Sequence, residues 1–285
     1  MKPVYSHSKF KIIGIGDFVC QTIETLSTTG LKDTDIYLCH YKPQTLEDSK
    51  AFKSIKMEEE LENFKNHSLN SEGFSESLFP TKSGMVFLIA DLKDEWNRKA
   101  TSIIAQLAKE RDQLTIAILP IYLTQEESFP LWDNSSRNFI DAIFLFDNEK
   151  LKKERINRKV DFTEYTLNII STFEVITNSS ADIAFDTEDL KVLLTDASRT
   201  QLQKGKATGK DRAIKAFNEA YKKSMNDCTR ALLFFQSGIN EITMDEIFDV
   251  TDILQNHLPE TASITWGAGL DHTLKDEVIV SLILN

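Results

Sequence analysis

The chain has 285 residues, of which 41% are hydrophobic and 27% charged, an ordinary composition for a soluble globular protein of about two domains. Its formal net charge of −11 argues against broad nucleic-acid binding, because contacts to phosphates need a basic surface. The three cysteines are widely spaced, and the sequence has neither an apolar signal core nor an apolar run of about 18 residues, so we expect a cytoplasmic protein without a disulfide framework or direct membrane insertion.

The first half of the sequence alternates apolar runs with amphipathic stretches. The runs expected to form strands lie at 10–15, 35–39, 85–90, 114–119 and 142–146. A helix follows the first run as far as Leu26, and another follows the third run. The second of these helices has one apolar stripe made of Trp96, Ala100, Ile103, Ile104, Leu107 and Ala108. Residues 41–82 are polar and show little periodicity, so their structure and role stay open.

The second half of the sequence shows a different order of expected helices and strands. After a basic connector, helices are expected at 162–177, 188–203 and 209–224. Strands are expected at 232–235, 263–269 and 277–284. Between the first two strands, Thr243 and Glu246 form a capping box, in which each side chain can accept a hydrogen bond from the other residue's backbone amide. The helix that this box opens is expected to end at Pro259.

These elements predict an α/β protein. Strands that alternate with helices form a parallel sheet covered on both faces, so we expect a Rossmann-like domain over residues 1–160. A central connecting helix is expected over 161–180, and a smaller α+β domain over 181–285.

Five blocks of the sequence resemble, in order and spacing, the bacterial division protein FtsZ and the wider tubulin superfamily. They lie at 11–16, 85–108, 141–151, 185–213 and 266–278. The last block, Trp-Gly-Ala-Gly-Leu-Asp and onward, is similar to the closing Phe-Gly-Ala-x-x-Asp segment of that family. The resemblance implies the tubulin/FtsZ fold, in which a GTPase-type Rossmann-like domain is joined by a central helix to an α+β domain.

The same resemblance places a nucleotide cradle at two glycine-rich turns, and both turns are altered in this chain. Such turns present backbone amides to phosphate groups, and glycine lets the backbone approach closely. The first turn keeps Gly14 and Gly16 but continues with Asp17, Phe18 and Gln21. The carboxylate of Asp17 would repel phosphate, and Phe18 would fill space that the ligand needs.

The second turn has lost its glycines altogether. The positions that correspond to the family's phosphate loop are Asp91, Asp94, Glu95, Trp96, Asn97 and Arg98. Asp94 and Glu95 favour the dipole of the following helix and compete with an incoming anion. Either Trp96 is a core residue at a well-formed helix start, or Trp96 and Phe18 plug the ancestral pocket. Neither interpretation favours GTP, although the net charge of +1 over 93–99 leaves a different anion site open.

Two further nucleotide contacts of the family are missing. The ribose-side loop is expected at 40–42, where the sequence reads His-Tyr-Lys in place of Asn-Thr-Asp. The carboxylate that the central helix offers to guanine aligns with Thr163. Asp161 or Glu164 could replace it if the alignment shifts by a residue or two.

One pair of catalytic positions is retained. In FtsZ-like filaments, two aspartates of one subunit polarise the attacking water in the nucleotide site of the next, and Asp186 and Asp189 occupy those positions. A neighbouring asparagine of the family is Ala184 here. The competing interpretation is structural, because Asp186 is a good helix N-cap and Asp189 a favourable first-turn acid.

Other chemistry is sparse in the sequence. The five histidines show no metal-ligand spacing, and no Cys-x-x-Cys pair occurs, so no metal is expected. Cys39 and His40 could suggest a nucleophile and its base, but neighbouring residues of a strand point to opposite faces.

The first functional hypothesis is an FtsZ/tubulin-like protein that has lost GTP binding and hydrolysis and acts through contacts with itself or with an FtsZ filament. The sequence ends directly after the closing strand, so an FtsZ-type C-terminal recruitment tail is not expected. The second hypothesis is a remodelled GTPase that binds GTP or GDP and uses Asp186 and Asp189. The third is a binding module that uses the vacated cleft for another ligand.

Overall fold

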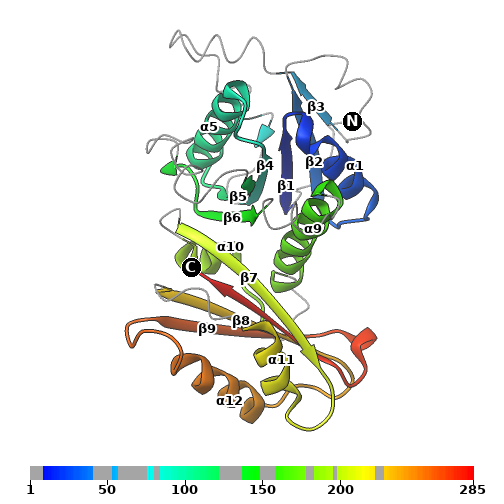
Figure 1. The fold of residues 1–285 in the computed structure, drawn as a ribbon, viewed down its shortest axis with the longest axis vertical. Helices are drawn as coiled ribbons and strands as arrows, with labels where there is room; N and C mark the ends of the chain where they lie inside the picture. Colours follow the sequence, from blue (N-terminus) through cyan, green and yellow to red (C-terminus); the bar gives the residue numbers. More distant parts are fainter. Residues whose placement is uncertain are drawn as a thin grey trace, which may run out of the picture. The chain divides into compact units, whose positions relative to one another are not determined.

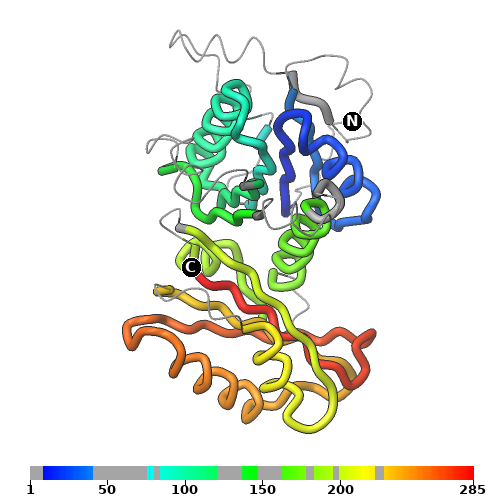
Figure 2. The backbone as a smooth tube through the Cα atoms, viewed as in Figure 1, coloured from blue at the N-terminus to red at the C-terminus, as the bar shows by residue number. Residues whose placement is uncertain are grey.

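The computed structural model forms two compact units, Met1–Asn168 and Ile169–Asn285, and helix α9 (Arg158–Ile176) runs across their boundary. Figure 2 follows the backbone through both units. The residues that the structure describes are 9–40, 53–56, 76, 78–79, 84–121, 137–147, 158–177, 183–194, 198–221 and 228–285. Most of the polar stretch at 41–82, and the first part of the basic connector, therefore lie outside the described residues.

The first unit contains a parallel sheet in the order β3-β2-β1-β4-β5-β6. Its strands are β1 (Phe10–Ile15), β2 (Thr34–His40), β3 (Lys53–Lys56), β4 (Met85–Ala90), β5 (Leu114–Ile121) and β6 (Ala142–Asp147). The five predicted strands are confirmed, and every residue of β1 and β4 is buried, as expected for central strands covered on both faces.

Helices cover both faces of this sheet. A short 3-10 turn η1 (Asp17–Val19) leads from β1 into α1 (Cys20–Thr28), and α5 (Glu95–Glu110) follows β4. Because β1 connects to β2 and β4 to β5 in opposite directions, right-handed crossovers place α1 and α5 on opposite faces, as Figure 1 shows. The sheet therefore has a switch point at the carboxyl ends of β1 and β4, where open α/β sheets bind their ligands.

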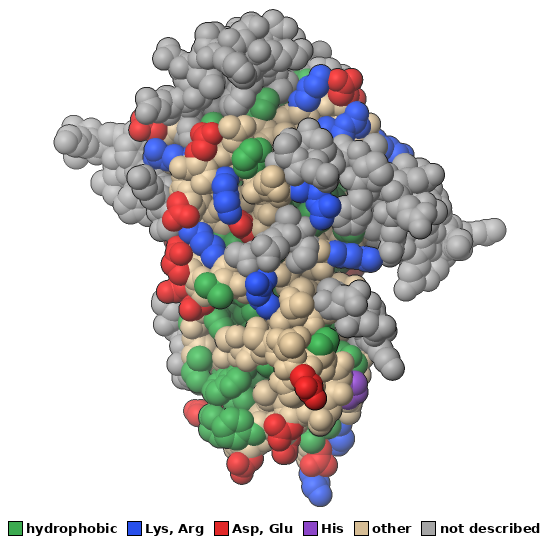
Figure 3. Space-filling model, turned by 90° about the vertical axis from the view of Figure 1, so that its left-hand side faces the viewer, with side chains coloured by type: hydrophobic (Ala, Val, Ile, Leu, Met, Phe, Trp, Pro, Cys, Tyr) green, Lys and Arg blue, Asp and Glu red, His purple; other side chains and the backbone are tan. Residues whose placement is uncertain are grey.

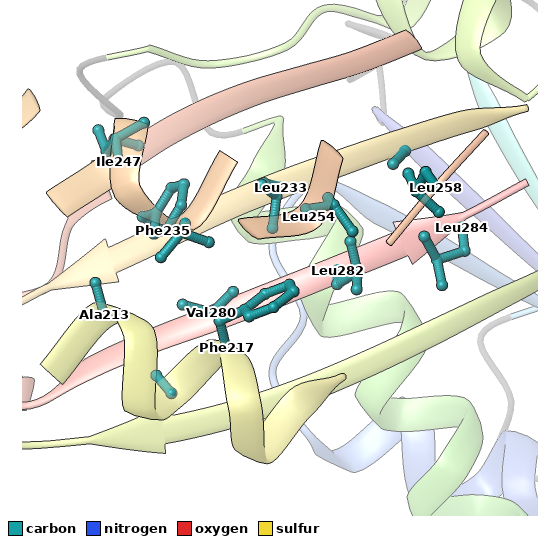
Figure 4. Close-up of a cluster of buried hydrophobic side chains, with 14 of the residues drawn as sticks. Ala213, Phe217, Leu233, Phe235, Ile247, Leu254, Leu258, Val280, Leu282 and Leu284 are labelled. Carbon is teal, nitrogen blue, oxygen red and sulfur yellow. The ribbon is translucent and has the colours of Figure 1, made fainter. Parts of the chain in front are cut away.

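The second unit is α+β. Its elements are α10 (Thr187–Leu193), β7 (Ser198–Ala207), α11 (Arg212–Ala220), β8 (Arg230–Ser237), α12 (Met244–Gln255), β9 (Ser263–Leu270), the 3-10 turn η2 (His272–Leu274) and β10 (Val278–Leu284). The strand order is β7-β10-β8-β9, with β8 and β9 parallel and the other pairs antiparallel. Figure 4 shows the core between α11, α12 and the sheet, where Phe217, Phe235, Leu254 and Leu282 are buried.

The helix predicted over 188–203 is wrong. The structure has the short helix α10 followed by strand β7, which pairs with β10 from Gln201 to Ala207. Gly205 lets α11 approach this strand, since a Cβ there would lie 2.2 Å from the backbone oxygen of Ala216. Pairing with a strand more than 70 residues away in the sequence and close packing of a helix have overridden the local helix pattern.

The other helices of the second half form with different ends. α9 begins four residues before the predicted start, and α11 is shorter than the stretch predicted over 209–224. The capping box of α12 is confirmed: Thr243 accepts from the amide of Glu246, and the Glu246 carboxylate accepts from the amide of Thr243. α12 ends at Gln255 rather than Pro259. Among the described residues, no helix combines the length and apolar character that a membrane span would require.

Candidate functional site

The structure brings two groups of predicted site residues together at the carboxyl ends of β1 and β4. The first group begins within β1 at Gly14 and continues after the strand with Gly16, Asp17, Phe18 and Gln21. The second group follows β4 and comprises Asp91, Asp94, Glu95, Trp96, Asn97 and Arg98. They meet because β1 and β4 are adjacent and parallel, with Ile15 opposite Ala90. Asp186 and Asp189 lie in the other unit.

The two retained glycines are required by packing inside the first unit. A Cβ on Gly14 would lie 2.2 Å from the Ile23 side chain, so α1 can pack on β1 only if this position has no side chain. Gly16 has φ 91° and donates its backbone N–H to the carbonyl of Cys39 (3.2 Å). A Cβ on Gly16 would lie 2.4 Å from the side-chain nitrogen of Asn97. The side chain of Asn97 therefore occupies the space directly beside the first glycine turn.

The N-terminus of α5 satisfies its own backbone amides. Asp94 is the N-cap, and its Oδ1 accepts from the amides of Trp96 (2.8 Å) and Asn97 (3.2 Å). The Asn97 side chain in turn donates to the carbonyl of Asp91 (2.8 Å), which fixes it in place. A phosphate at a helix N-terminus binds through such amides, so here these donors are already engaged by a carboxylate.

The cations of this turn are also engaged. Arg98 donates from Nη1 to the carbonyls of Leu92 (2.8 Å) and Lys93 (2.9 Å), so its guanidinium closes the turn that precedes α5. Lys99 pairs with Glu95 one helical turn earlier. Arg98 and Lys99, two of the three cations that left an anion site open in the sequence, are therefore bound to groups of the same turn.

A contact between three elements was not predicted. Asp17 Oδ1, directly after β1, lies 3.0 Å from Nε2 of His40 at the end of β2. The His40 side chain is fully buried, whereas that of Asp17 is 62% exposed. The ring of Trp96, at the start of α5, lies 6.2 Å from the His40 ring. Trp96 is only partly buried, so it lies at the edge of the core stripe that the sequence predicted, together with Ile103.

Aromatic side chains fill the region between η1, the end of β6 and the start of α9. Phe18 packs on Phe162 (5.3 Å between ring centroids), Phe162 on Phe146 (5.4 Å) and Phe146 on Tyr165 (5.2 Å). Phe162 is fully buried, and the Tyr165 hydroxyl donates to the carbonyl of Leu145 (3.2 Å). We call Phe18, Phe146, Phe162 and Tyr165 the aromatic cluster. The sequence pattern revealed only Phe18 of these four as a site residue.

The position aligned with the guanine contact is bound to a neighbouring helix. The hydroxyl of Thr163 lies 2.8 Å from the hydroxyl of Thr22 on α1, and both side chains are buried. Glu164, the next residue of α9, is exposed. The start of α9 is therefore fastened to α1 at the point where the family resemblance places the base of a nucleotide.

Asp186 and Asp189 form a capping box at the start of α10. Asp186 Oδ1 accepts from the amide of Asp189 (2.8 Å), and Asp189 Oδ2 accepts from the amide of Asp186 (3.0 Å). The structure thus gives both carboxylates a local role in starting a helix. A catalytic role for them stays a prediction. Within the described residues, no three His, Cys, Asp or Glu side chains converge in a way that could hold a metal ion.

Comparison with known proteins agrees with this fold. The family described as the FtsZ family, C-terminal domain, matches residues 199–285. The cell division protein FtsZ of Mycoplasmopsis pulmonis is 23% identical over 97% of this chain and 76% of its own length. Cell division protein FtsZ 1 of Methanocaldococcus jannaschii is 22% identical over 97% of this chain and 82% of its own length.

Solved structures resemble the whole chain. An empty FtsZ dimer from M. jannaschii has a TM-score of 0.72 at 20% identity and covers 97% of this chain and 88% of its own. CetZ from Methanosaeta thermophila has a TM-score of 0.67 at 12% identity and covers 97% and 86%. The chain is a divergent FtsZ-like protein of the tubulin/FtsZ superfamily.

The family match and the altered turns of this FtsZ-like chain lie in different units. Residues 199–285 belong to the second unit, whereas the turns after β1 and β4 belong to the first. The relatives include archaeal as well as bacterial proteins. The tubulin/FtsZ fold that the sequence blocks predicted is confirmed.

Proposed function

We propose that this protein is an FtsZ/tubulin-like protein of the cytoskeleton or of cell division that does not bind or hydrolyse GTP and acts through protein contacts. Relatives that align with nearly the whole chain are cell division proteins, which supports the general role. The first unit supports the loss of nucleotide binding, because its contacts use the donors and the space that a nucleotide would need. The protein would work in the cytoplasm, where FtsZ itself or another copy of this chain would be within reach.

The observation that carries the proposal is the start of α5. For a phosphate to bind there, it would have to displace the Asp94 carboxylate from two backbone amides and the Asn97 side chain from beside Gly16. Both steps break hydrogen bonds, and the exposed Asp94 and Glu95 carboxylates would repel the incoming anion. The favourable binding energy that this helix N-terminus could give a nucleotide is therefore offset by the cost of rearranging Asp94 and Asn97.

The geometry of α10 argues against the hydrolase alternative. Asp186 and Asp189 already accept hydrogen bonds from each other's backbone amides, which explains their presence without catalysis. A water-polarising carboxylate also needs a phosphate opposite it, and at α5 the amides of Trp96 and Asn97 are already bound to Asp94. We therefore propose that the protein acts by binding other protein chains. The M. jannaschii FtsZ solved as a dimer favours a second copy of this chain or an FtsZ as the partner.

Nucleotide titration tests the proposal directly. The protein is freed of nucleotide, and GTP or GDP is added up to about 1 mM while intrinsic fluorescence and the melting temperature are followed. A ligand with a Kd of about 10 μM would stabilise the fold by about 2.7 kcal/mol at that concentration, a shift of several degrees. We expect no shift in either measurement, and Trp96 beside the closed turn is placed to report any binding.

Micromolar binding of GTP or GDP would overturn the proposal. Turnover that disappears in Asp186→Ala but survives in Asp186→Asn would make this carboxyl a positioning cap, and turnover lost in both would make it catalytic. Stabilisation by a non-nucleotide metabolite alone would favour the cleft-binding module instead.

Co-sedimentation tests the role in protein contacts. FtsZ is assembled with GTP in the presence of this protein, and filament mass and turnover are measured against assembly without it. We expect this protein to sediment with the filaments or to change their mass at near-equal molar ratios. No effect on FtsZ, combined with a monomeric state of this protein at all concentrations, would contradict the proposed mode of action.

A further inference from the structure

The second unit carries a face whose composition differs from an ordinary solvated surface. Among the described residues, five large hydrophobic side chains are exposed, and three of them lie within ten residues of one another: Ile239 (71%), Met244 (46%) and Phe248 (51%). Met244 and Phe248 are four residues apart on α12 and therefore lie on the same side of the helix. We call Ile239, Met244 and Phe248, with the acidic residues beside them, the α12 face.

Acidic residues lie beside these apolar side chains. Glu241, Asp245, Asp249 and Asp252 are exposed, and the sequence from 239 to 255 contains no lysine or arginine. Glu246 is the one carboxylate of α12 with a basic partner in the described part of the chain, Arg212. Figure 3 shows the side of the molecule that lies on the left in Figure 1, where α12 turns into β9. On this side of the second unit, hydrophobic and acidic side chains lie next to each other.

This charge pattern is not what the stability of α12 requires. Thr243, Asp245 and Glu246 at the N-terminus favour the helix through capping and through the helix dipole. Asp252, in contrast, lies in the last turn, where a negative charge opposes the dipole, and that turn contains no basic residue. Asp245 and Asp249 are four residues apart and repel each other. The helix therefore keeps charges that weaken it, next to an exposed aromatic ring.

The turn that leads into this helix is held in place before any partner arrives. Arg212 donates from Nη2 to the carbonyl of Glu241 (2.8 Å), and the amide of Ile242 donates to the hydroxyl of Ser237 (3.1 Å). The Asn240 side chain hydrogen-bonds to Asp276. A preformed surface loses little conformational entropy on binding, which favours association.

We infer that the α12 face is a docking surface for a basic, amphipathic segment of another protein, whose apolar side chains pack on Met244 and Phe248 while its lysines or arginines meet Asp245, Asp249 and Asp252. Exposed Met and Phe provide the apolar contact that is enriched in interface cores. The row of carboxylates along one side of α12 favours a cationic partner and repels anionic membranes and nucleic acid. This inference does not depend on whether the first unit binds a nucleotide.

A defined peptide tests the docking surface. The probe is a fluorescent helical peptide of about 18 residues made of leucine and lysine. As a helix it spans about 27 Å, more than the roughly 18 Å of the 12-residue helix α12, so it can cover the whole α12 face. Two control peptides accompany it: a scrambled sequence of the same composition, without an apolar face, and a leucine–glutamate helix. Binding is measured by fluorescence anisotropy on the full chain at low and raised salt concentration.

We expect the leucine–lysine helix to bind at least about tenfold more tightly than either control, because apolar contact and charge must both match. Binding should weaken with added salt, since the charge contribution is screened. The double change Met244→Ser and Phe248→Ser, and separately Asp249→Lys with Asp252→Lys, should each weaken binding about tenfold or more. Val192→Ser, which alters an exposed apolar side chain (73%) on α10, is the matched control and should have no effect.

Several outcomes would overturn the inference. Equal binding of the scrambled peptide, or equal losses in Val192→Ser, would show general attraction to an acidic protein rather than docking on α12. An absence of peptide binding, together with a dimer in sedimentation that Phe248→Ser dissolves, would assign the face to a second copy of this chain. Far-ultraviolet circular dichroism and the melting temperature confirm that each variant folds, as expected for substitutions on an outward-facing helix surface.

Discussion

The turns around α5 and the start of α10 are the two places where the FtsZ family resemblance predicts chemistry, and they differ in sequence but agree in structure. At α5 the expected glycines have been replaced, whereas at α10 the expected Asp186 and Asp189 are retained. In both places the polar groups satisfy one another: Asp94 caps α5, and the two aspartates cap α10. Retained residues of a family motif therefore indicate function only where folding does not also require them.

The glycines of the first unit extend this comparison. Gly14 and Gly16 remain because helix packing and a positive φ need them, with or without a ligand. At the positions that correspond to the family's phosphate loop, larger side chains stand where the resemblance places glycines, as expected under our proposal that this turn holds no nucleotide. The predictions below test how much the residues of the two units contribute to the stability of the fold.

The largest effect is expected in the aromatic cluster. Phe162→Ala should lower the free energy of unfolding by about 3–5 kcal/mol, because it removes a fully buried ring and leaves a cavity. Urea denaturation measures this change. The matched control is Phe248→Ala, whose ring is half exposed and whose loss should cost less than about 1 kcal/mol. Equal costs for the two variants would mean that the cluster is not a packed core.

The stability of the second unit should depend strongly on the side chain of Arg212. Its side chain donates to Glu246 Oε1 (3.0 Å) and to the carbonyl of Glu241 (2.8 Å). Arg212→Ala should cost about 2–3 kcal/mol in the same denaturation experiment, because the change leaves a partly buried carboxylate without its partner. Lys210→Ala, at an exposed position next to α11, should be close to neutral. A cost below about 1 kcal/mol for Arg212→Ala would show that the ion pair is merely a surface contact.

Helix caps should give smaller effects of similar size in both units. Asp94→Ala and Asp186→Ala should each cost about 1 kcal/mol, whereas the corresponding asparagine variants should be nearly neutral, since asparagine also accepts from backbone amides. Thermal unfolding measures all four. If Asp186→Asn destabilised the protein as much as Asp186→Ala, the negative charge rather than the cap would be what α10 needs.

The smallest effect is expected in the pH dependence of stability. Partial burial alone would raise the pKa of Glu246, but the hydrogen bonds and charge of Arg212, with the hydrogen bonds from Thr243, outweigh burial and hold this pKa below its ordinary value of 4.5. A lowered folded-state pKa stabilises the protein above the unfolded-state value, and this contribution is lost as the pH falls through the folded-state pKa.

The stability of the unaltered protein should therefore exceed that of Glu246→Gln most clearly above pH 4.5, and the two should converge below it. The control is Asp249→Asn, on the same helix but exposed, whose difference from the unaltered protein should stay small across this range. A difference between Glu246→Gln and the unaltered protein that persists at low pH would assign the effect to packing rather than to charge.

Local sequence patterns predicted most of the fold. The buried strands β1 and β4 appeared as continuous apolar runs, and the capping box of α12 was visible in residues 243 to 246. Strand β7 was not predicted, because its conformation depends on pairing with β10 far along the chain. Its polar residues show no clear alternation typical of a strand. The helical pattern of α10, directly before it, was therefore continued into β7 in the prediction.

The candidate site shows the same division. The two altered turns were located through the family resemblance, and the structure shows that they meet because β1 and β4 are adjacent and parallel. The contacts of His40 with Asp17 and of Thr163 with Thr22 join residues 23 and 141 positions apart, and no local pattern contains them. Asn97 was aligned with the phosphate loop, but its position beside Gly16 follows only from the three-dimensional structure.

The side chain of Asn97 beside Gly16 has a consequence for the history of this chain. Removing Asp94 alone would uncap α5 and leave Asn97 in the way, and removing Asn97 alone would leave the amides bound to Asp94. Either first step would cost stability without restoring a phosphate site. If the first unit binds no nucleotide, as we propose, a return to nucleotide binding would need both substitutions together, because neither one alone opens a phosphate site at this turn.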